Sequence, residues 1–253
     1  MPETFATLAI VALGAALGGF VQGLSGFAFG LVALSLWAWV LPPQVVAPLV
    51  VFGALSGQIA SFASFRGGFD RRIILPLIAG GVFGVPIGVF LLHNVDPLSF
   101  KLAFGALLIA YSLVGWVAPR LPKFAGGGQG ADAAAGFVGG VFGGLGGMAG
   151  TVPASWGLLR GWRPEARRAA MQAYNIAMHV LTLTLYWRTG ALQSTPWTLY
   201  ALVLPAMLGP SYWGARVIKN ASEATVTRVI LACLFASGLA LIVGASRGMS
   251  PLR

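Results

Sequence analysis

Charged residues are absent from long stretches of this chain. Between Glu3 and Arg66 there is no charged side chain across 62 positions. Six further charge-free runs follow, at 73–95, 102–119, 133–159, 169–187, 189–215 and 229–246. A membrane-spanning helix needs roughly 20 apolar residues, so each later run has room for one span and the first has room for two. The spacing of charges therefore predicts an all-α integral membrane protein that crosses the bilayer several times.

The composition excludes a soluble domain. Only 9% of the 253 residues are charged and 57% are hydrophobic, whereas a soluble domain is usually about a quarter charged. The net charge of +10 would suggest nucleic-acid binding in a soluble protein, but Arg and Lys in cytoplasmic loops explain it in a membrane protein. We therefore expect a lipid bilayer, and no nucleic acid, as the surroundings of this chain.

Three further features bear on chemistry and location. Cys233 is the only cysteine, which excludes a disulfide framework and a thiolate metal site, and we expect no cofactor and no metal. The N-terminal MPETF lacks the basic start of a signal peptide, so we expect no cleaved leader. Arginine outnumbers lysine by 13 to 3, as is typical of GC-rich bacterial genomes, and we expect a multi-pass protein of the bacterial inner membrane.

Short segments recur in the same order in the two halves of the chain. GGFVQGLSG at 18–26 matches GGVFGGLGG at 139–147, at an offset of 121 residues. Later matches follow at offsets that grow to 126 residues: Pro43 with Pro164, Arg66 with Arg188, and Asn94 with Asn220. We interpret them as two homologous repeats, at 1–118 and 133–253, joined by a turn-rich linker at 119–132.

Each repeat is predicted to contain four hydrophobic segments, and the first of the four is unusual. The predicted segments are 5–40, 44–65, 73–92 and 100–118, then 133–159, 167–187, 196–217 and 226–245. The opening segment of each repeat is interrupted by glycines: Gly23, Gly26 and Gly30 in one, Gly143, Gly144, Gly146, Gly147 and Gly150 in the other. Because glycine costs about 1 kcal/mol in a helix interior, such a cluster either breaks the helix or lets another helix approach closely.

Loop charge favours the break. If all eight segments cross once, eight basic residues fall on each side of the membrane. If the two opening segments instead turn back at their glycines, twelve fall on one side and four on the other, as the positive-inside rule requires. Each repeat would then make an odd number of crossings, so the repeats would be inverted relative to each other, as in many secondary transporters. Eight plain crossings are the alternative.

A set of motifs resembles the sulfite exporter TauE/SafE family. In the first repeat the motifs are GLSGFAFG, PPQVVAP, RGGFDRR and GVPIGVFLL. In the second repeat they are GGLGGMAGT, RPEARRAAMQAYN and WGARVIKN. The resemblance covers nearly the whole chain and implies a permease for sulfite, sulfonates or related small anions.

The polar residues within the predicted segments favour an anion as substrate. No Asp or Glu lies in a segment interior, whereas cation transporters place acids there. A broken helix supplies the donors that an anion needs, through the free N–H groups at the start of its second half. We therefore predict a site where the two breaks meet the sixth segment. Its candidate substrate ligands are Gln22, Ser25, Gly26, Gly146, Gly147, Thr151, Gln172 and Asn175.

Each of these residues also has a simpler interpretation. The glycines can serve close helix packing alone, and the polar side chains can serve interhelical hydrogen bonds alone. His179 shares a helix face with Gln172 and Asn175 and aligns with Gln58 at the 121 offset. His179 is the candidate for proton coupling, although a buried neutral histidine is the alternative. Arg66 and Arg188 occupy equivalent positions in the two repeats. They are candidate gates for the substrate, with membrane-edge anchors as the alternative.

These observations favour a secondary transporter (permease) of a small oxyanion, sulfite or an organosulfonate, that works by alternating access. An anion channel, or a permease for a different small solute, is the alternative. We expect no enzyme, because the predicted segments offer no nucleophile–base pair, acid dyad or metal cluster. The sequence is compatible with a homodimer.

Overall fold

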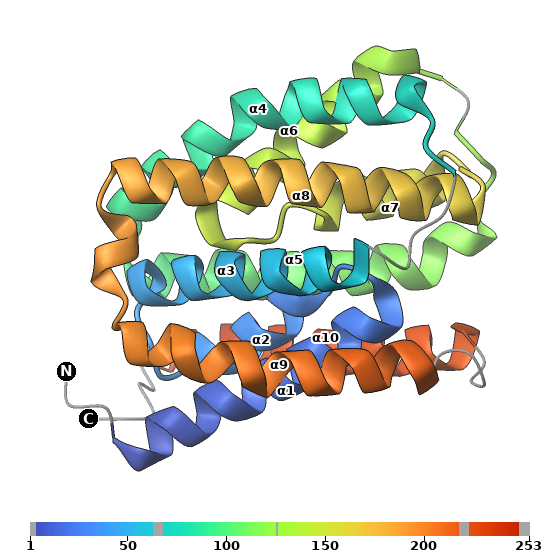
Figure 1. Cartoon of the computed structure of the whole chain (residues 1–253). Coiled ribbons are helices and arrows are strands. Elements are labelled where there is room, and N and C mark those ends of the chain that lie inside the picture. Colours follow the sequence, from blue (N-terminus) through green and yellow to red (C-terminus); the bar gives the residue numbers. More distant parts are fainter. Residues whose placement is uncertain (1–3, 63–67, 125, 218–222, 248–253) are drawn as a thin grey trace.

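The computed structural model describes residues 4–62, 68–124, 126–217 and 223–247. In these residues the first half forms α1 (Phe5–Ser25), α2 (Phe29–Trp37), α3 (Pro43–Phe62), α4 (Arg71–Asn94), α5 (Pro97–Val117) and the short η1 (Ala118–Arg120). The second half forms α6 (Gly128–Gly146), α7 (Thr151–Leu159), α8 (Pro164–Arg188), the short η2 (Ala191–Ser194), α9 (Trp197–Val217) and α10 (Glu223–Ser246). The long helices lie side by side, and all run across the view of Figure 1.

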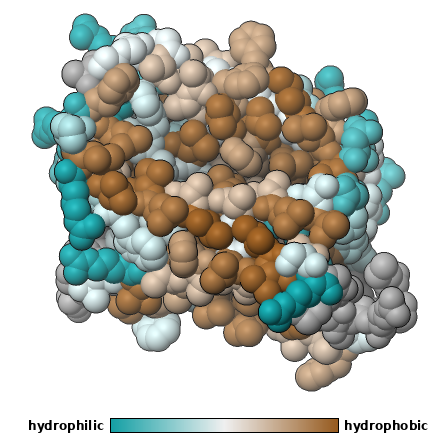
Figure 2. All heavy atoms as spheres, turned by 180° about the vertical axis from the view of Figure 1, so that it is seen from behind, coloured by the Kyte–Doolittle hydropathy of each residue, from teal (hydrophilic) through white to brown (hydrophobic). Residues whose placement is uncertain are grey.

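The molecule has the surface of a membrane protein. Five stretches of the described helices are long and apolar enough to cross a bilayer: Phe5–Ser25, Pro43–Ala60, Arg71–Asn94, Pro97–Arg120 and Thr227–Ser246. Apolar side chains cover the middle of the face in Figure 2, and hydrophilic ones gather toward its edges. The predicted all-α membrane class is therefore confirmed.

The first predicted segment is two helices folded into a hairpin. α1 ends at Gly26, whose φ of 88° is a left-handed conformation that glycine adopts at little cost. α2 then runs back along α1, because Phe29 packs against Gly18 and Trp37 reaches the start of α1. The indole Nε1 of Trp37 donates a hydrogen bond to Val11 O at 3.1 Å.

The opening segment of the second half folds in the same way. α6 ends at Gly147, with a φ of 72°, and α7 runs back so that Pro153 lies against Gly139. Here Trp156 Nε1 donates to Asp132 Oδ1 at 2.8 Å. The predicted break of each opening segment is confirmed, and the two glycines at the turns are 121 residues apart.

Helices of the two halves pack against each other in matched pairs. α4 lies along α6, and α9, the counterpart of α4, lies along α1, the counterpart of α6. The counterparts α5 and α10 also pack together, as do α3 and α8. In both of these last pairs the two helices run antiparallel: Gly105 meets Gly238 while Gly115 meets Leu231, and Gln58 meets Gln172 while Val45 meets Thr195 beyond the end of α8.

The glycines before the second break serve this packing. Gly136, Gly140 and Gly144 each lie against the backbone of α4, which a Cβ atom would push away. For these three residues the close-packing interpretation holds. Gly147 lies beyond this ladder, at the turn itself.

The start of α6 differs from the predicted boundary. The fifth hydrophobic segment was expected to begin at residue 133, but α6 begins at Gly128 and takes in Asp132. Asp132 is 3% exposed. Its carboxylate is tolerated there because it accepts the hydrogen bond from Trp156 and forms an ion pair with Arg160, whose Nε lies 3.3 Å from Oδ1.

Candidate substrate site

The two helix breaks touch each other inside the bundle. A Cβ atom placed on Gly30, in the first turn of α2, would lie 2.9 Å from the carbonyl oxygen of Gly147. Gly147 also packs against Val50 and Val51 of α3. The two breaks are therefore in contact, as the sequence predicts, and the middle of α3 lies beside them.

Two short helices start at these breaks without a side-chain cap. The N-cap residues are Ala28 for α2 and Gly150 for α7, and neither makes a side-chain capping bond. The first N–H groups of a helix have no partner within the helix, and they form the positive end of its dipole. The start of α2 therefore presents backbone donors at the first break, whereas at the start of α7 the N–H of Thr151 donates to Met148 O at 3.2 Å and Pro153 has no N–H.

Ser25 stabilises the turn of the first break. Its Oγ donates to Val21 O at 2.8 Å and accepts from the N–H groups of Phe27 and Ala28, at 3.4 and 3.2 Å. The hydroxyl of Ser25 is thus engaged with backbone, although the residue also borders the cavity described below.

Three buried glutamines join the first break to α3 and α8. Gln22 Nε2 donates to Ala54 O at 3.2 Å, and Gln58 Nε2 donates to Gly26 O at 2.9 Å. Gln172 Nε2 donates to the main-chain oxygen of Gln58 at 2.8 Å. Gln22 and Gln172 were predicted ligands. Gln58 was not, and its alignment with His179 was the signal in the sequence.

The remaining predicted residues lie around the second break. A Cβ on Gly150 would lie 2.7 Å from both amide atoms of Asn175, so Asn175 packs against the start of α7. His179 Nε2 lies 3.2 Å from Gly147 O. Because a carbonyl oxygen only accepts, Nε2 carries the hydrogen. Thr151 is the buried first residue of α7.

A cavity of about 560 Å³ opens beside the first break. The break itself (residues 24–28), α5, α7, the start of α8 and α10 line it. Its polar lining consists of Ser25, Tyr111, Glu165, Arg167, Arg168, Gln172 and Thr227. Arg168 reaches the break, since a Cβ on Gly26 would lie 3.9 Å from its Nε. From the sequence, both arginines were interpreted only as charged residues of a loop.

The corresponding place at the second break is filled by apolar side chains. A Cβ on Gly146 would lie 3.1 Å from Met148 Cε, 3.6 Å from Phe100 Cζ and 3.7 Å from Leu34 Cδ1. Met148 is the counterpart of Phe27 at the 121 offset. Among the described residues, those of the first break line the cavity and those of the second break do not.

Of the two predicted gate arginines, only Arg188 is among the described residues, and it lies away from this region. Arg188 is the last residue of α8 and is exposed. It lies nine residues beyond His179, about 14 Å along the helix. Arg66 lies outside the described residues.

The comparisons with known proteins bear on the whole chain. The family model described as "Sulfite exporter TauE/SafE" matches residues 10–241, a span that holds both breaks, the cavity and all the candidate ligands. The comparison with curated proteins found no match, and neither did the comparison with solved structures. The matched description is that of a transporter and not of an enzyme. Because the match covers most of its length, the chain belongs to the sulfite exporter TauE/SafE family, a family of membrane transporters for sulfur-containing anions.

Proposed function

We propose that this chain is a secondary transporter that carries sulfite or an organosulfonate across the bacterial inner membrane by alternating access. The anion binds where the two breaks meet. The observation that carries this proposal is the contact between Gly30 and Gly147, which brings the uncapped starts of α2 and α7 together.

The chemistry of this place suits an oxyanion. A helix start carries roughly half a positive elementary charge, and two starts meet here at glycines that let an oxygen approach the backbone. Among the described residues that line the cavity beside the first break, Arg167 and Arg168 carry positive charge and Glu165 is the one carboxylate. Gln172 lies on the path between the cavity and the breaks, because it lines the cavity and its Nε2 bonds to α3.

Two features support alternating access. The first is the arrangement of the halves: α3 and α5 run antiparallel to their counterparts, as expected of inverted repeats that exchange roles between an inward-open and an outward-open state. The second is the inequality of the breaks. One borders a cavity, whereas Met148, Phe100 and Leu34 cover the other.

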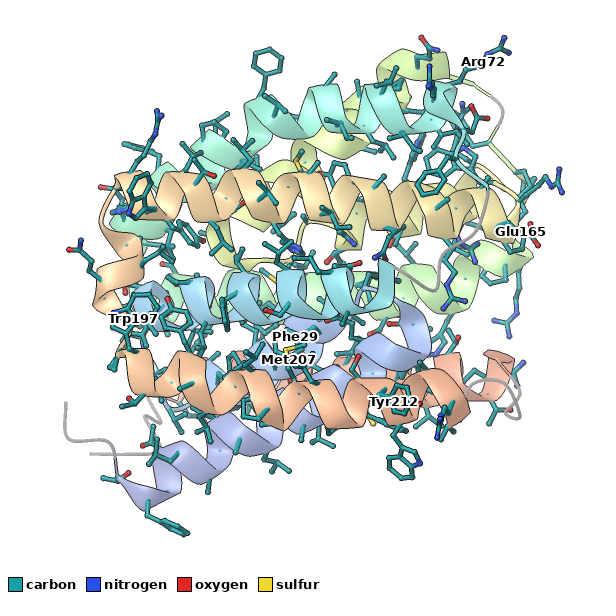
Figure 3. The ribbon with its side chains drawn as sticks, viewed as in Figure 1. Phe29, Arg72, Glu165, Trp197, Met207 and Tyr212 are labelled. Carbon is teal, nitrogen blue, oxygen red and sulfur yellow. The ribbon has the colours of Figure 1, made fainter. Side chains whose placement is uncertain are left out.

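Charge supports an orientation. Ten of the thirteen described basic residues lie at helix ends on the side where α8 begins: Arg71, Arg72, Arg120, Lys123, Arg160, Arg163, Arg167, Arg168, Arg216 and Arg228. Lys101, Arg188 and Arg247 lie at the opposite ends. In Figure 3 Arg72 and Glu165 mark the first side and Trp197 the other. By the positive-inside rule, the cavity opens toward the cytoplasm.

Uptake into proteoliposomes tests the proposal. Labelled sulfite and a small sulfonate are offered to vesicles preloaded with either anion or with neutral buffer. We expect saturable uptake that the internal anion stimulates. Arg168→Gln and Gln172→Ala should each raise KM about tenfold, which corresponds to about 1.4 kcal/mol of binding free energy, whereas Arg188→Gln, at the far end of α8, should leave KM unchanged.

The other outcomes are informative. Conductance without counterflow would make the protein an anion channel. Uptake equal to that of empty vesicles for both anions would exclude the proposed cargo.

A further inference from the structure

Buried side chains around the two breaks carry acceptor atoms that lack a hydrogen-bond partner among the described residues. These atoms are Gln22 Oε1, Gln58 Oε1, Asn175 Oδ1, His179 Nδ1 and Thr182 Oγ1. All five side chains are at least 98% buried. Buried polar atoms in folded proteins nearly always have a partner, so a cluster of this kind at a proposed transport site points to a missing ligand.

The orientation of the two glutamines is fixed by their other atom. Gln22 and Gln58 each point Nε2 at a main-chain carbonyl oxygen. Turning either amide over would place two oxygens against each other. Their Oε1 atoms are therefore true acceptors.

The hydrogen bonds place the side chains of Gln22 and Gln58 along one turn of α3, and Asn175 lies on the helix that packs against α3. Gln22 bonds to Ala54 O, and Gln58 lies four residues further along the same helix, about 6 Å away. Asn175 lies one turn beyond Gln172 on α8, and Gln172 bonds to the main chain of Gln58. Asn175 also packs on Gly150 at the second break. The three side chains thus lie next to the two breaks, Gln58 against Gly26 and Asn175 against Gly150.

Acceptors are the wrong polarity for an anion, and they need a positive partner. The five atoms have almost no accessible surface. A bare cation approaches oxygen more closely, at ~2.3–2.6 Å for Ca²⁺, against ~2.7–2.8 Å for a hydrogen bond between oxygens. Na⁺ has nearly the ionic radius of Ca²⁺ and a single charge.

We propose that a sodium ion binds between the breaks, with Gln22 Oε1, Gln58 Oε1 and Asn175 Oδ1 as ligands, and is carried together with the anion. The free lone pairs of Gly26 O and Gly147 O complete the site. No group of three His, Cys, Asp or Glu side chains suited to a metal occurs among the described residues. Neutral oxygens suit a hard monovalent cation, and the transported anion supplies the negative charge. The inference rests on the proposed function, since it makes sodium the coupling ion of that transport.

Sodium binding is tested first without transport. The thermal stability of the purified full chain is measured in NaCl, KCl and choline chloride at one ionic strength, with no sulfur anion present. We expect Tm to rise with NaCl in a saturable manner and not with the other salts. Gln58→Leu should abolish the rise. Gln44→Leu is the matched control: Gln44 lies on α3 but bonds to Leu92 O and Val95 O, away from the breaks.

A second variant keeps the test decisive if Gln58→Leu does not fold. Asn175→Asp adds a negative charge to the site without removing a hydrogen bond between described residues, and it should lower the NaCl concentration of half-maximal stabilisation at least tenfold. Asn94→Asp, at the exposed end of α4, is its control and should not.

Transport then separates this inference from the proposed function. Sulfite uptake should be faster with an inward Na⁺ gradient than with choline. Equal uptake in both salts would overturn the sodium site and leave the carrier intact. Uptake driven by a pH gradient and lost in His179 variants would replace sodium by a proton. Stabilisation by Na⁺ with no anion flux would support the site and overturn the cargo.

Discussion

Gln58 and His179 make the same contact in the two halves of the molecule. Gln58 Nε2 donates to Gly26 O at 2.9 Å, and His179 Nε2 donates to Gly147 O at 3.2 Å. Both the side chains and the glycines are 121 residues apart in the sequence. A carbonyl at the end of a helix has no partner within that helix, so in each half the helix after the hairpin supplies one and holds the break in place.

This symmetry predicts what His179 does. If its task is to donate to Gly147 O, then His179→Gln should preserve transport within about twofold, because Gln performs the same task in the first half. His179→Leu leaves the buried carbonyl without a donor, at a cost of about 1–3 kcal/mol, and should lower both Tm and the initial rate. Uptake and thermal melting of the two variants check this.

The pH profile of His179→Gln separates anchoring from proton coupling. If His179 only anchors the break, the pH profile of uptake by His179→Gln should equal that of the wild-type protein. Loss of pH-driven accumulation in His179→Gln, with the protein still folded, would instead identify His179 as the titrating group.

The two glycines at the turns should tolerate alanine to different degrees. Both have φ values that alanine adopts at a cost of about 1–2 kcal/mol. A Cβ on Gly26 meets nothing nearer than Arg168 Nε at 3.9 Å, whereas a Cβ on Gly147 would lie 2.8 Å from Val50 Cγ1. We therefore expect Gly147→Ala to lower Tm more than Gly26→Ala. Gly209→Ala, in open space on α9, should not lower Tm. An equal loss of Tm at both turns would show that the Val50 side chain moves aside at no cost in stability.

The buried ion pair at the base of the second hairpin should be costly to break. Asp132 accepts from Trp156 and pairs with Arg160, which also donates to Gly126 O at 2.9 Å. Arg160→Ala leaves the carboxylate with one partner, and we expect a loss of about 3 kcal/mol or more. Asp132→Asn with Arg160→Ala should be less damaging than Arg160→Ala alone. Chemical or thermal unfolding of these two variants and of Asp132→Asn alone tests the coupling, and additive losses would mean that the pair contributes little.

The glycine clusters and the distribution of loop charge together predicted both hairpins, because the glycines lower the cost of a helix break and the positive-inside rule favours one. The role of Ser25 could be predicted only in part. Its place at the break follows from the sequence, but the hydrogen bonds of its hydroxyl with three backbone groups depend on the geometry of the turn. Arg167 and Arg168 were missed for a related reason. A charge at the end of an apolar run has the same pattern whether it faces a loop or, as here, a cavity formed by helices far away in the sequence. The predicted homodimer stays a prediction.

Thiol labelling should reveal the inequality of the two breaks directly. Cys233 is exposed on α10, so a Cys233→Ala background is needed. Phe27 lines the cavity beside the first break, whereas its counterpart Met148 is 3% exposed in an apolar cluster. A membrane-impermeant thiol reagent applied from the cytoplasmic side should therefore modify Phe27→Cys rapidly and Met148→Cys slowly.

Alternating access makes a stronger demand on the same pair. When a gradient drives the carrier toward its other state, Met148→Cys should become reactive from the outer side while Phe27→Cys becomes protected. The two changes should occur at the same anion concentration, because one rearrangement closes one break and opens the other. Simultaneous labelling of both positions would instead indicate a continuous pore. Labelling rates that do not depend on the anion concentration would show that the cavity is not involved in transport.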